Sequence, residues 1–153
     1  MTATPPQADF YILQSSDPTS RYRSLCYLLV KAWLRHRIYI HCQDSTQADH
    51  LNDFIWHCLP DSFLPHSCLG HGTGVAIELG LGQQVPQHRD VLINLAMEVP
   101  HRHQEFNRII EFVVQNDQIL QATRAHYQLY YQQGCKLRHH TLRKNDDNHL
   151  SLH

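Results

Sequence analysis

A strand that leads directly into a capped helix, within residues 37–59, limits the folds open to this chain more than any other segment. The β-branched and aromatic residues at 38–41 predict a short strand. Asp44 or Ser45 follows as a helix cap, with Gln47 three residues after Asp44 at the spacing of a capping box. The apolar residues beyond it share one helix face: Ala48, Leu51, Ile55, Cys58 and Leu59. Such a unit is half of a β-α-β crossover, and open α/β sheets commonly bind ligands where its strand ends.

The rest of the chain repeats this alternation of strands and helices. The expected strands lie at residues 10–13, 38–41, 75–79, 90–95 and 109–114, and the expected helices at 20–36, 44–59 and 116–133. Asn116 or Asp117 is the expected cap of the last helix, and Gly134 is its expected stop. This order predicts an α/β protein whose mostly parallel sheet is covered by helices.

The length of 153 residues suits one domain. Residues 1–8 are expected to form a flexible lead-in, residues 9–137 the α/β domain, and residues 138–153 a polar, basic and mobile tail. Prolines and glycines interrupt the periodicity over residues 60–74, which predicts a long loop there.

The composition excludes some classes of protein. With 42% apolar and 18% charged residues the chain is typical of a soluble globular protein. A net charge of −1 argues against a whole-surface attraction to nucleic acid. The five cysteines include no C-x-x-C pair and are expected to be reduced and buried. Neither a signal peptide nor a membrane span is predicted, so we expect a cytoplasmic protein with no membrane contact.

A nucleotide site is not expected. Close approach to phosphate requires glycines between strand and helix. The turn at residues 43–46 has no glycine and places Asp44 where phosphate would lie. The glycine-rich stretch at 70–74 is followed by no lysine. We therefore predict no nucleotide-binding loop and no cofactor.

Fourteen histidines raise the question of a metal site. The only close pairs are His101 with His103 and the doublet His139–His140, and neither has a cysteine or acid at a recognised zinc spacing. No paired carboxylates stand out either. We expect no metal and no catalytic residue. A metal-dependent hydrolase that uses His101, His103 and other histidines remains the alternative.

Two groups of residues suggest contacts with other proteins. Trp56 lies off the main apolar stripe of its helix, and Phe63 follows it in a proline-bounded segment. They are either anchors for a partner or side chains packed beneath the 60–74 loop. The second group is a helix face that mixes aromatic rings with one cation, which suits an acidic peptide unless it is simply solvated. Its members are Leu120, Arg124, Tyr127, Gln128 and Tyr131.

The order of several segments resembles a known family. The segments are DFYIL, IHCQD, QADHLNDFIW, SFLPHSCLG, PQHRDVLINL, FNRIIEFV and AHYQLYYQQG, and they span residues 9–137. In this order and spacing they resemble the chi subunit of the bacterial DNA polymerase III holoenzyme. The most specific are DFIW with SFLPH, and RDVLINL.

The resemblance implies a single-domain, three-layer, Rossmann-like α/β fold that binds no nucleotide and has no active site of its own. Chi proteins are accessory subunits of the clamp loader in DNA replication. They bind the psi subunit on one surface and the acidic C-terminal peptide of single-stranded DNA-binding protein on another. Contact with DNA is then expected to be indirect, and direct binding through the basic tail after Leu137 is a further possibility.

Matching the family residue by residue assigns both surfaces. Trp56 and Phe63 fall on the psi-facing surface. The peptide-binding surface takes Val113, Leu120, Arg124, Tyr127 and Gln128. Leu120 and Gln128 stand where some members have basic residues, which removes two cations, and Lys136 or Arg138 is a candidate to compensate.

Overall fold

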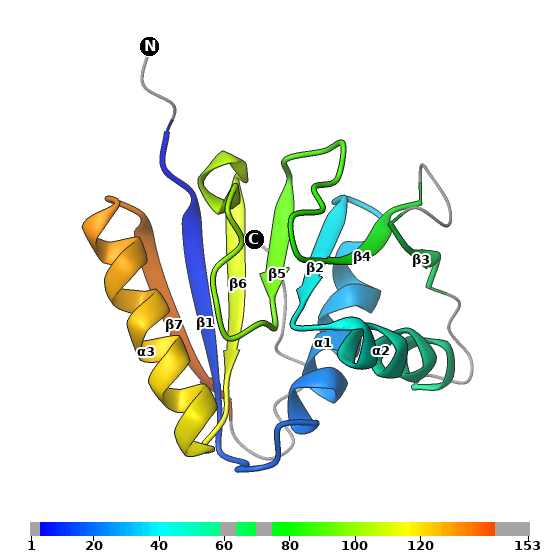
Figure 1. Ribbon diagram of the computed structural model, residues 1–153, viewed down its shortest axis with the longest axis horizontal. Coiled ribbons are helices and arrows are strands. Elements are labelled where there is room, and N and C mark those ends of the chain that lie inside the picture. The colour runs from blue at the N-terminus through cyan, green and yellow to red at the C-terminus, as the bar shows by residue number, and fades with distance from the viewer. Residues whose placement is uncertain (1–3, 59–63, 70–74, 143–153) are drawn as a thin grey trace.

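The computed structural model of the protein describes residues 4–58, 64–69 and 75–142. Within these ranges the elements are β1 (Gln7–Leu13), α1 (Ser20–Ala32), β2 (Ile38–Cys42), α2 (Ser45–His57), β3 (His66–Cys68), β4 (Ile77–Leu81), β5 (Val91–Asn94), the 3-10 turn η1 (His103–Glu105), β6 (Arg108–Val113), α3 (Asp117–Gln132) and β7 (Lys136–Leu142). The strands form one sheet in the order β3-β4-β2-β5-β6-β1-β7, and every neighbouring pair is parallel. Figure 1 shows the helices arranged around this sheet.

Helices cover both faces of the sheet. The crossovers through α1 and α2 lead toward the β3 edge, while the crossover through α3 leads toward the β7 edge. Right-handed crossovers in opposite directions place their helices on opposite faces. The core is divided accordingly: Ile38 and Ile40 pack with α1 and α2, whereas Tyr39 between them packs in the cluster that contains Tyr130 of α3. The predicted three-layer α/β fold is confirmed.

Loops cover the part of the α3 face that the helix does not reach. The β4–β5 connection and the β5–β6 connection cross this face above Tyr39. The Tyr39 ring stacks on Phe106, with 6.1 Å between ring centroids and 12° between planes. Both rings belong to the same buried cluster as Leu92 of β5.

The predicted helix caps are also confirmed. The Asp44 carboxylate accepts a hydrogen bond of 2.8 Å from the backbone N–H of Gln47, which caps α2. Asn116 caps α3 through a 3.2 Å bond from the Ile119 N–H. One contact differs from a standard capping box. The Gln47 side chain accepts a 2.6 Å hydrogen bond from the N–H of Gln43 rather than from that of the cap residue Asp44.

Both edges of the sheet differ from the sequence-based expectation. The prediction of a loop throughout residues 60–74 was wrong, because His66–Cys68 form β3 beside β4. At the other edge, β7 pairs with β1 from Lys136 to Leu142 and so extends into the segment predicted as a tail. Strand β1 itself begins at Gln7, within the predicted lead-in. Edge strands are short or largely exposed, so neither has the apolar pattern that marks a buried strand.

Gly80 of β4 lies against the buried Tyr39 ring, which leaves no room for a side chain. A Cβ atom at this position would lie 2.7 Å from the Tyr39 hydroxyl and 2.9 Å from Cδ1 of Leu69. The Tyr39 hydroxyl is held by the Gln84 carbonyl at 3.2 Å, so the ring cannot withdraw without losing a bond. We expect Gly80→Ala to lower the free energy of unfolding by about 1–3 kcal/mol, measured by urea denaturation.

Gln83→Ala is the matched control for Gly80→Ala. It introduces the same side chain into the adjacent exposed connection. We expect Gln83→Ala to change the free energy of unfolding by less than about 0.5 kcal/mol. Equal stability of Gly80→Ala and the wild-type protein would contradict the close packing of β4 against Tyr39.

Candidate partner-binding surfaces

The structure brings together the apolar residues assigned to the peptide surface. Val113 ends β6 and lies opposite Ile12 of β1 in the strand register. Leu120 and Tyr127 of α3 are half-buried and pack in the same cluster as Val113. The Tyr127 ring meets Phe10 edge-on, with 5.3 Å between centroids. These contacts form one apolar surface where α3 lies on β1 and β6.

The polar members of this surface lie on the exposed side of α3. Arg124 and Gln128 follow Leu120 at intervals of four residues, which places the three on one helix face. No hydrogen bond or ion pair joins the Arg124 side chain to another residue of the described ranges. Its guanidinium is therefore available for an anionic partner. We call the set Val113, Leu120, Arg124, Tyr127 and Gln128 the α3 surface.

The two cations expected to compensate for Leu120 and Gln128 point elsewhere. Leu137 of β7 packs into the cluster on the α3 side of the sheet. Side chains alternate along a strand, so Lys136 and Arg138 lie on the opposite face. Arg138 is instead close enough to Tyr11 to affect its pKa. Burial, followed by the charge of Asp9, raises the pKa of Tyr11 to about 12, while the charges of Arg108 and Arg138 oppose this rise. Compensation by Lys136 or Arg138 is not favoured.

Trp56 lies in the last turn of α2 and is 48% exposed. Its indole packs on the ring of His66 in β3, with 4.4 Å between centroids. The His66 ring is itself held in place, because its nitrogens lie 2.6 Å from the Leu64 carbonyl oxygen and 3.2 Å from that of Asn52. Trp56 is thus a supported aromatic side chain at the surface. Phe63, its expected neighbour, lies outside the described residues.

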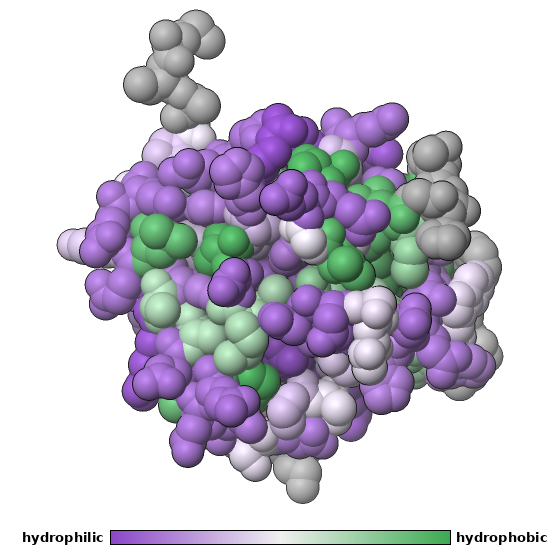
Figure 2. Space-filling view, viewed as in Figure 1, coloured by the Kyte–Doolittle hydropathy of each residue, from purple (hydrophilic) through white to green (hydrophobic). Residues whose placement is uncertain are grey.

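The two candidate surfaces are well separated. Helix α2 packs over β2, β3 and β4, and α3 packs over β6 and β7 on the other face. In Figure 1 the two helices stand at opposite sides of the sheet. Figure 2 shows that the molecular face seen in this view is mainly hydrophilic, with small apolar groups on the α3 side and on the β4 side. Two partners could occupy the surfaces without meeting.

A buried polar network fixes α3 to the sheet, and sequence reasoning did not identify it. Glu111 of β6 is 1% exposed. One carboxylate oxygen lies 2.7 Å from Nδ1 of His126, and the other accepts a 2.5 Å hydrogen bond from the Tyr130 hydroxyl. Nε2 of His126 lies 2.9 Å from the Met97 carbonyl oxygen. The only signal in the sequence was an acid within the apolar strand IIEFV.

Glu111 favours the protonated form of His126. Burial lowers the pKa of His126, but the hydrogen bond and the charge of Glu111, together with the Met97 carbonyl, outweigh burial and raise the pKa above its usual value of 6.5. Burial and Glu111 raise the pKa of Tyr130 well above 10, so its hydroxyl stays protonated and donates. Glu111, His126 and Tyr130 therefore position the α3 surface on the sheet.

The turn between β2 and α2 offers little to a phosphate. The Asp44 carboxylate already occupies the N–H of Gln47 at the start of the helix, and its negative charge would repel an anion. The side chain of Gln43 is also engaged, since its oxygen accepts a 2.7 Å bond from the Met97 N–H. This geometry agrees with the prediction that the turn is not a nucleotide-binding loop.

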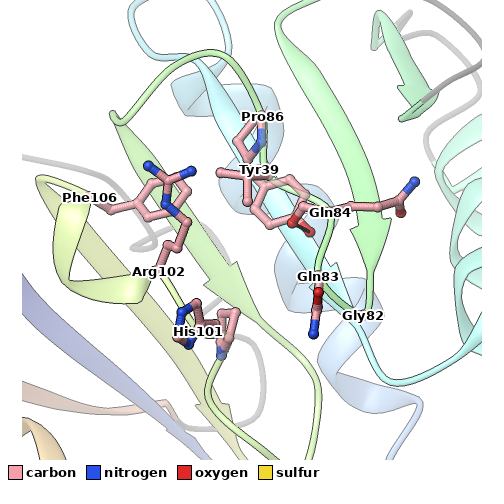
Figure 3. Close-up of a pocket in the computed structure, with 10 residues that line it drawn as sticks. Tyr39, Gly82, Gln83, Gln84, Pro86, His101, Arg102 and Phe106 are labelled. Atoms are coloured by element: carbon pink, nitrogen blue, oxygen red, sulfur yellow. Dashed lines mark hydrogen bonds between the residues drawn. The ribbon is translucent and has the colours of Figure 1, made fainter.

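A pocket of about 360 Å³ lies between the β4–β5 and β5–β6 connections. Figure 3 shows Tyr39 and Phe106 at this pocket, with Arg102 and His101 contributed by the β5–β6 connection. Such a volume suits a small ligand. No sequence motif falls on this pocket except His101.

Among the described residues, the histidines proposed for a hydrolase are not arranged around a common centre. His101 is exposed, whereas His103 is buried, with its ring nitrogens 2.8 Å from the Pro100 carbonyl oxygen and 2.9 Å from Oε1 of Gln133. In the part of the chain that the structure describes, no group of three His, Cys, Asp or Glu side chains could hold a metal ion. Nor, in the same ranges, is any helix long and apolar enough to cross a membrane.

Comparison with known proteins assigns the chain to a family. The family model described as DNA polymerase III chi subunit, HolC, matches residues 6–138. This match includes both candidate surfaces and nearly all of the sheet.

Curated relatives give the same result. The chain is 37% identical to DNA polymerase III subunit chi of Pseudomonas aeruginosa over 137 residues, covering 89% of this chain and 96% of the relative. Identity to the subunit chi of Haemophilus influenzae is 32% over 134 residues, covering 85% of this chain and 93% of the relative. Identity to the subunit chi of Escherichia coli is 30% over 138 residues, covering 85% of this chain and 94% of the relative. The chain belongs to the DNA polymerase III chi subunit family.

Proposed function

We propose that this protein is a non-catalytic adaptor subunit of the replicative DNA polymerase clamp loader. It binds the psi subunit near Trp56 and the acidic C-terminal peptide of single-stranded DNA-binding protein at the α3 surface. The observation that carries the proposal is the Arg124 side chain, which is exposed and has no partner within the described ranges beside half-buried Leu120 and Tyr127. Family membership and the location of the two surfaces on opposite faces of the sheet support it.

The peptide is recognised through charge and apolar contact together. Arg124 pairs with the terminal carboxylate or an acidic side chain, which the planar guanidinium can bind through two parallel hydrogen bonds. Leu120 and Tyr127, supported by Val113 from below, accept the apolar end of the peptide. With Leu120 and Gln128 in place of cations, Arg124 supplies the positive charge within the α3 surface.

This function requires no chemistry from the chain. Each partner is bound by surface contacts, and both contacts can exist at once because the surfaces lie on opposite faces of the sheet. The subunit thereby connects the clamp loader to template coated by single-stranded DNA-binding protein. Its own contact with DNA is indirect, in keeping with a net charge of −1.

Replacing Trp56 with alanine is expected to abolish co-purification of the psi subunit. An exposed aromatic anchor at the centre of an interface commonly accounts for 2 kcal/mol or more, about thirtyfold or more in Kd. Affinity for the acidic C-terminal peptide should stay unchanged, because the α3 surface lies on the other face. The measurement is co-purification of psi with tagged wild-type and variant protein.

Leu34→Ala provides the matched control for Trp56→Ala. Leu34 is a large apolar side chain that is 76% exposed and follows α1. This variant should retain psi as the wild-type protein does. Retention of psi by Trp56→Ala at the wild-type level would remove Trp56 from the proposed interface.

A further inference from the structure

Helices α1 and α2 lie side by side and run in the same direction. Both follow parallel strands, and their Cα atoms approach within 8 Å. Near its start, α1 contacts α2 through Tyr22, whose hydroxyl accepts a 3.3 Å hydrogen bond from the Gln47 side chain. The Tyr22 ring also meets Phe54 edge-on, with 5.9 Å between centroids. Tyr22 and Phe54 therefore fix the register between the helices.

One helical turn beyond this ring contact, each helix presents a cysteine. Cys26 follows Tyr22 by four residues and Cys58 follows Phe54 by four residues. Four residues advance a helix by about 6 Å, in the same direction for two helices that run the same way. Because Tyr22 and Phe54 are in contact, the residues four positions after each of them, Cys26 and Cys58, lie beside each other where α1 meets α2.

A surface hollow joins these two thiols. Its volume is about 370 Å³, and its lining includes both cysteines together with Arg23, Tyr27 and Phe54. Cys26 is 1% exposed, while Cys58 is half-buried at the end of α2 and donates to the Ile55 carbonyl over 3.6 Å. Burial raises the pKa of the Cys26 thiol, and its interaction with the Cys58 thiol raises it further. Cys58 is thus the member of the pair that an oxidant reaches first.

We propose that Cys26 and Cys58 form a dithiol site that is oxidised reversibly to a disulfide by a peroxide. The Cys58 sulfur attacks hydrogen peroxide, breaks the O–O bond and releases one water as it becomes a sulfenic acid. The Cys26 sulfur then attacks the Cys58 sulfur, loses its proton and displaces the hydroxyl group as a second water. Two thiols and one peroxide give one disulfide and two waters, and a dithiol reductant reverses the change.

The disulfide would act where α2 ends. Cys58 comes two residues after Trp56, so a bond to α1 fixes the turn that carries this exposed ring. The bond also encloses β2 and α2 in a covalent loop, which restricts the unfolded chain. Oxidation should therefore raise the melting temperature by several degrees.

Mass spectrometry of the full-length chain tests this site. After treatment with excess hydrogen peroxide and digestion without reductant, wild-type protein should yield a peptide that links Cys26 to Cys58, and the link should disappear on reduction. Cys58→Ser should yield no such peptide and no rise in melting temperature. Cys68→Ser, which removes another half-buried cysteine, should behave as wild type.

Three results would overturn the proposal. The first is oxidation of Cys58 to a sulfinic acid while Cys26 remains a free thiol. The second is a disulfide that joins two chains, and the third is a link between another pair of cysteines. Cys58 is half-buried at a helix end, so Cys58→Ser is expected to fold and keeps the test valid even if Cys26→Ser does not.

Discussion

Arg124→Ala should weaken binding of an acidic C-terminal peptide by about tenfold to more than a hundredfold. The substitution removes a charge-assisted hydrogen bond, which contributes about 1.5–3 kcal/mol when the peptide covers it. The fold should be unaffected, because Arg124 is exposed and has no hydrogen bond or ion pair to another described residue. Calorimetric titration of the peptide from single-stranded DNA-binding protein into wild-type and variant protein measures the change in Kd.

Arg35→Ala is the control for the loss of one positive charge. Arg35 is exposed and lies just beyond α1, on the opposite side of the sheet from α3. It should leave the peptide affinity within about twofold of wild type at a salt concentration near 0.15 M, where distant surface charges are screened. If Arg124→Ala binds the peptide as tightly as Arg35→Ala does, Arg124 is not the anchor.

Glu111→Ala should destabilise the protein by about 3–5 kcal/mol, the usual cost of removing one partner from a buried pair. The change leaves the His126 ring and the Tyr130 hydroxyl without their buried acceptor. It also removes the polar contacts that join α3 to β6, so the peptide affinity should fall together with the free energy of unfolding. Urea denaturation gives the free energy of unfolding. A loss below about 1 kcal/mol would show that the Glu111 network does not fix α3.

The pH dependence isolates the charge of this network. His126 has a raised pKa in the folded protein, so protonation favours folding. Its contribution is fully present below pH 6.5 and is lost as the pH rises through the raised value. Glu111 also acts on Arg21: burial lowers the pKa of Arg21, and the charge of Glu111 opposes this lowering. The stability advantage of wild type over Glu111→Gln should therefore narrow above pH 6.5, and a constant difference would contradict the ion pair.

The sequence predicted those parts of the fold that local chemistry determines. The Asp44 and Asn116 caps, the stop at Gly134 and the buried central strand 91–94 each carry their signal within a few residues. The edge strands do not. The segment KLRHHTL of β7 is polar, and it is a strand because its backbone bonds to β1 along its whole length. This strand is therefore specified by its pairing with β1, and the local sequence of residues 136–142 does not predict it.

The candidate surfaces, too, could be predicted from the sequence only in part. Family resemblance supplied Arg124 and Tyr127, but the sequence alone could not show that Phe10 supports Tyr127 from a strand more than a hundred residues away. Nor could it show that Lys136 and Arg138 point away from α3, because this depends on the strand alternation set by Leu137. The role of Glu111 likewise depends on side chains that only the fold brings together.

One measurement tests the central claim, that two partners bind at separate surfaces. Amide chemical shifts of isotope-labelled protein are recorded with the acidic C-terminal peptide and then, in the same sample, with the psi subunit. The account predicts that the peptide shifts amides around Arg124 and Tyr127, and that psi shifts amides around Trp56 while the peptide stays bound. Displacement of the peptide by psi, or peptide-induced shifts centred on α2, would contradict it.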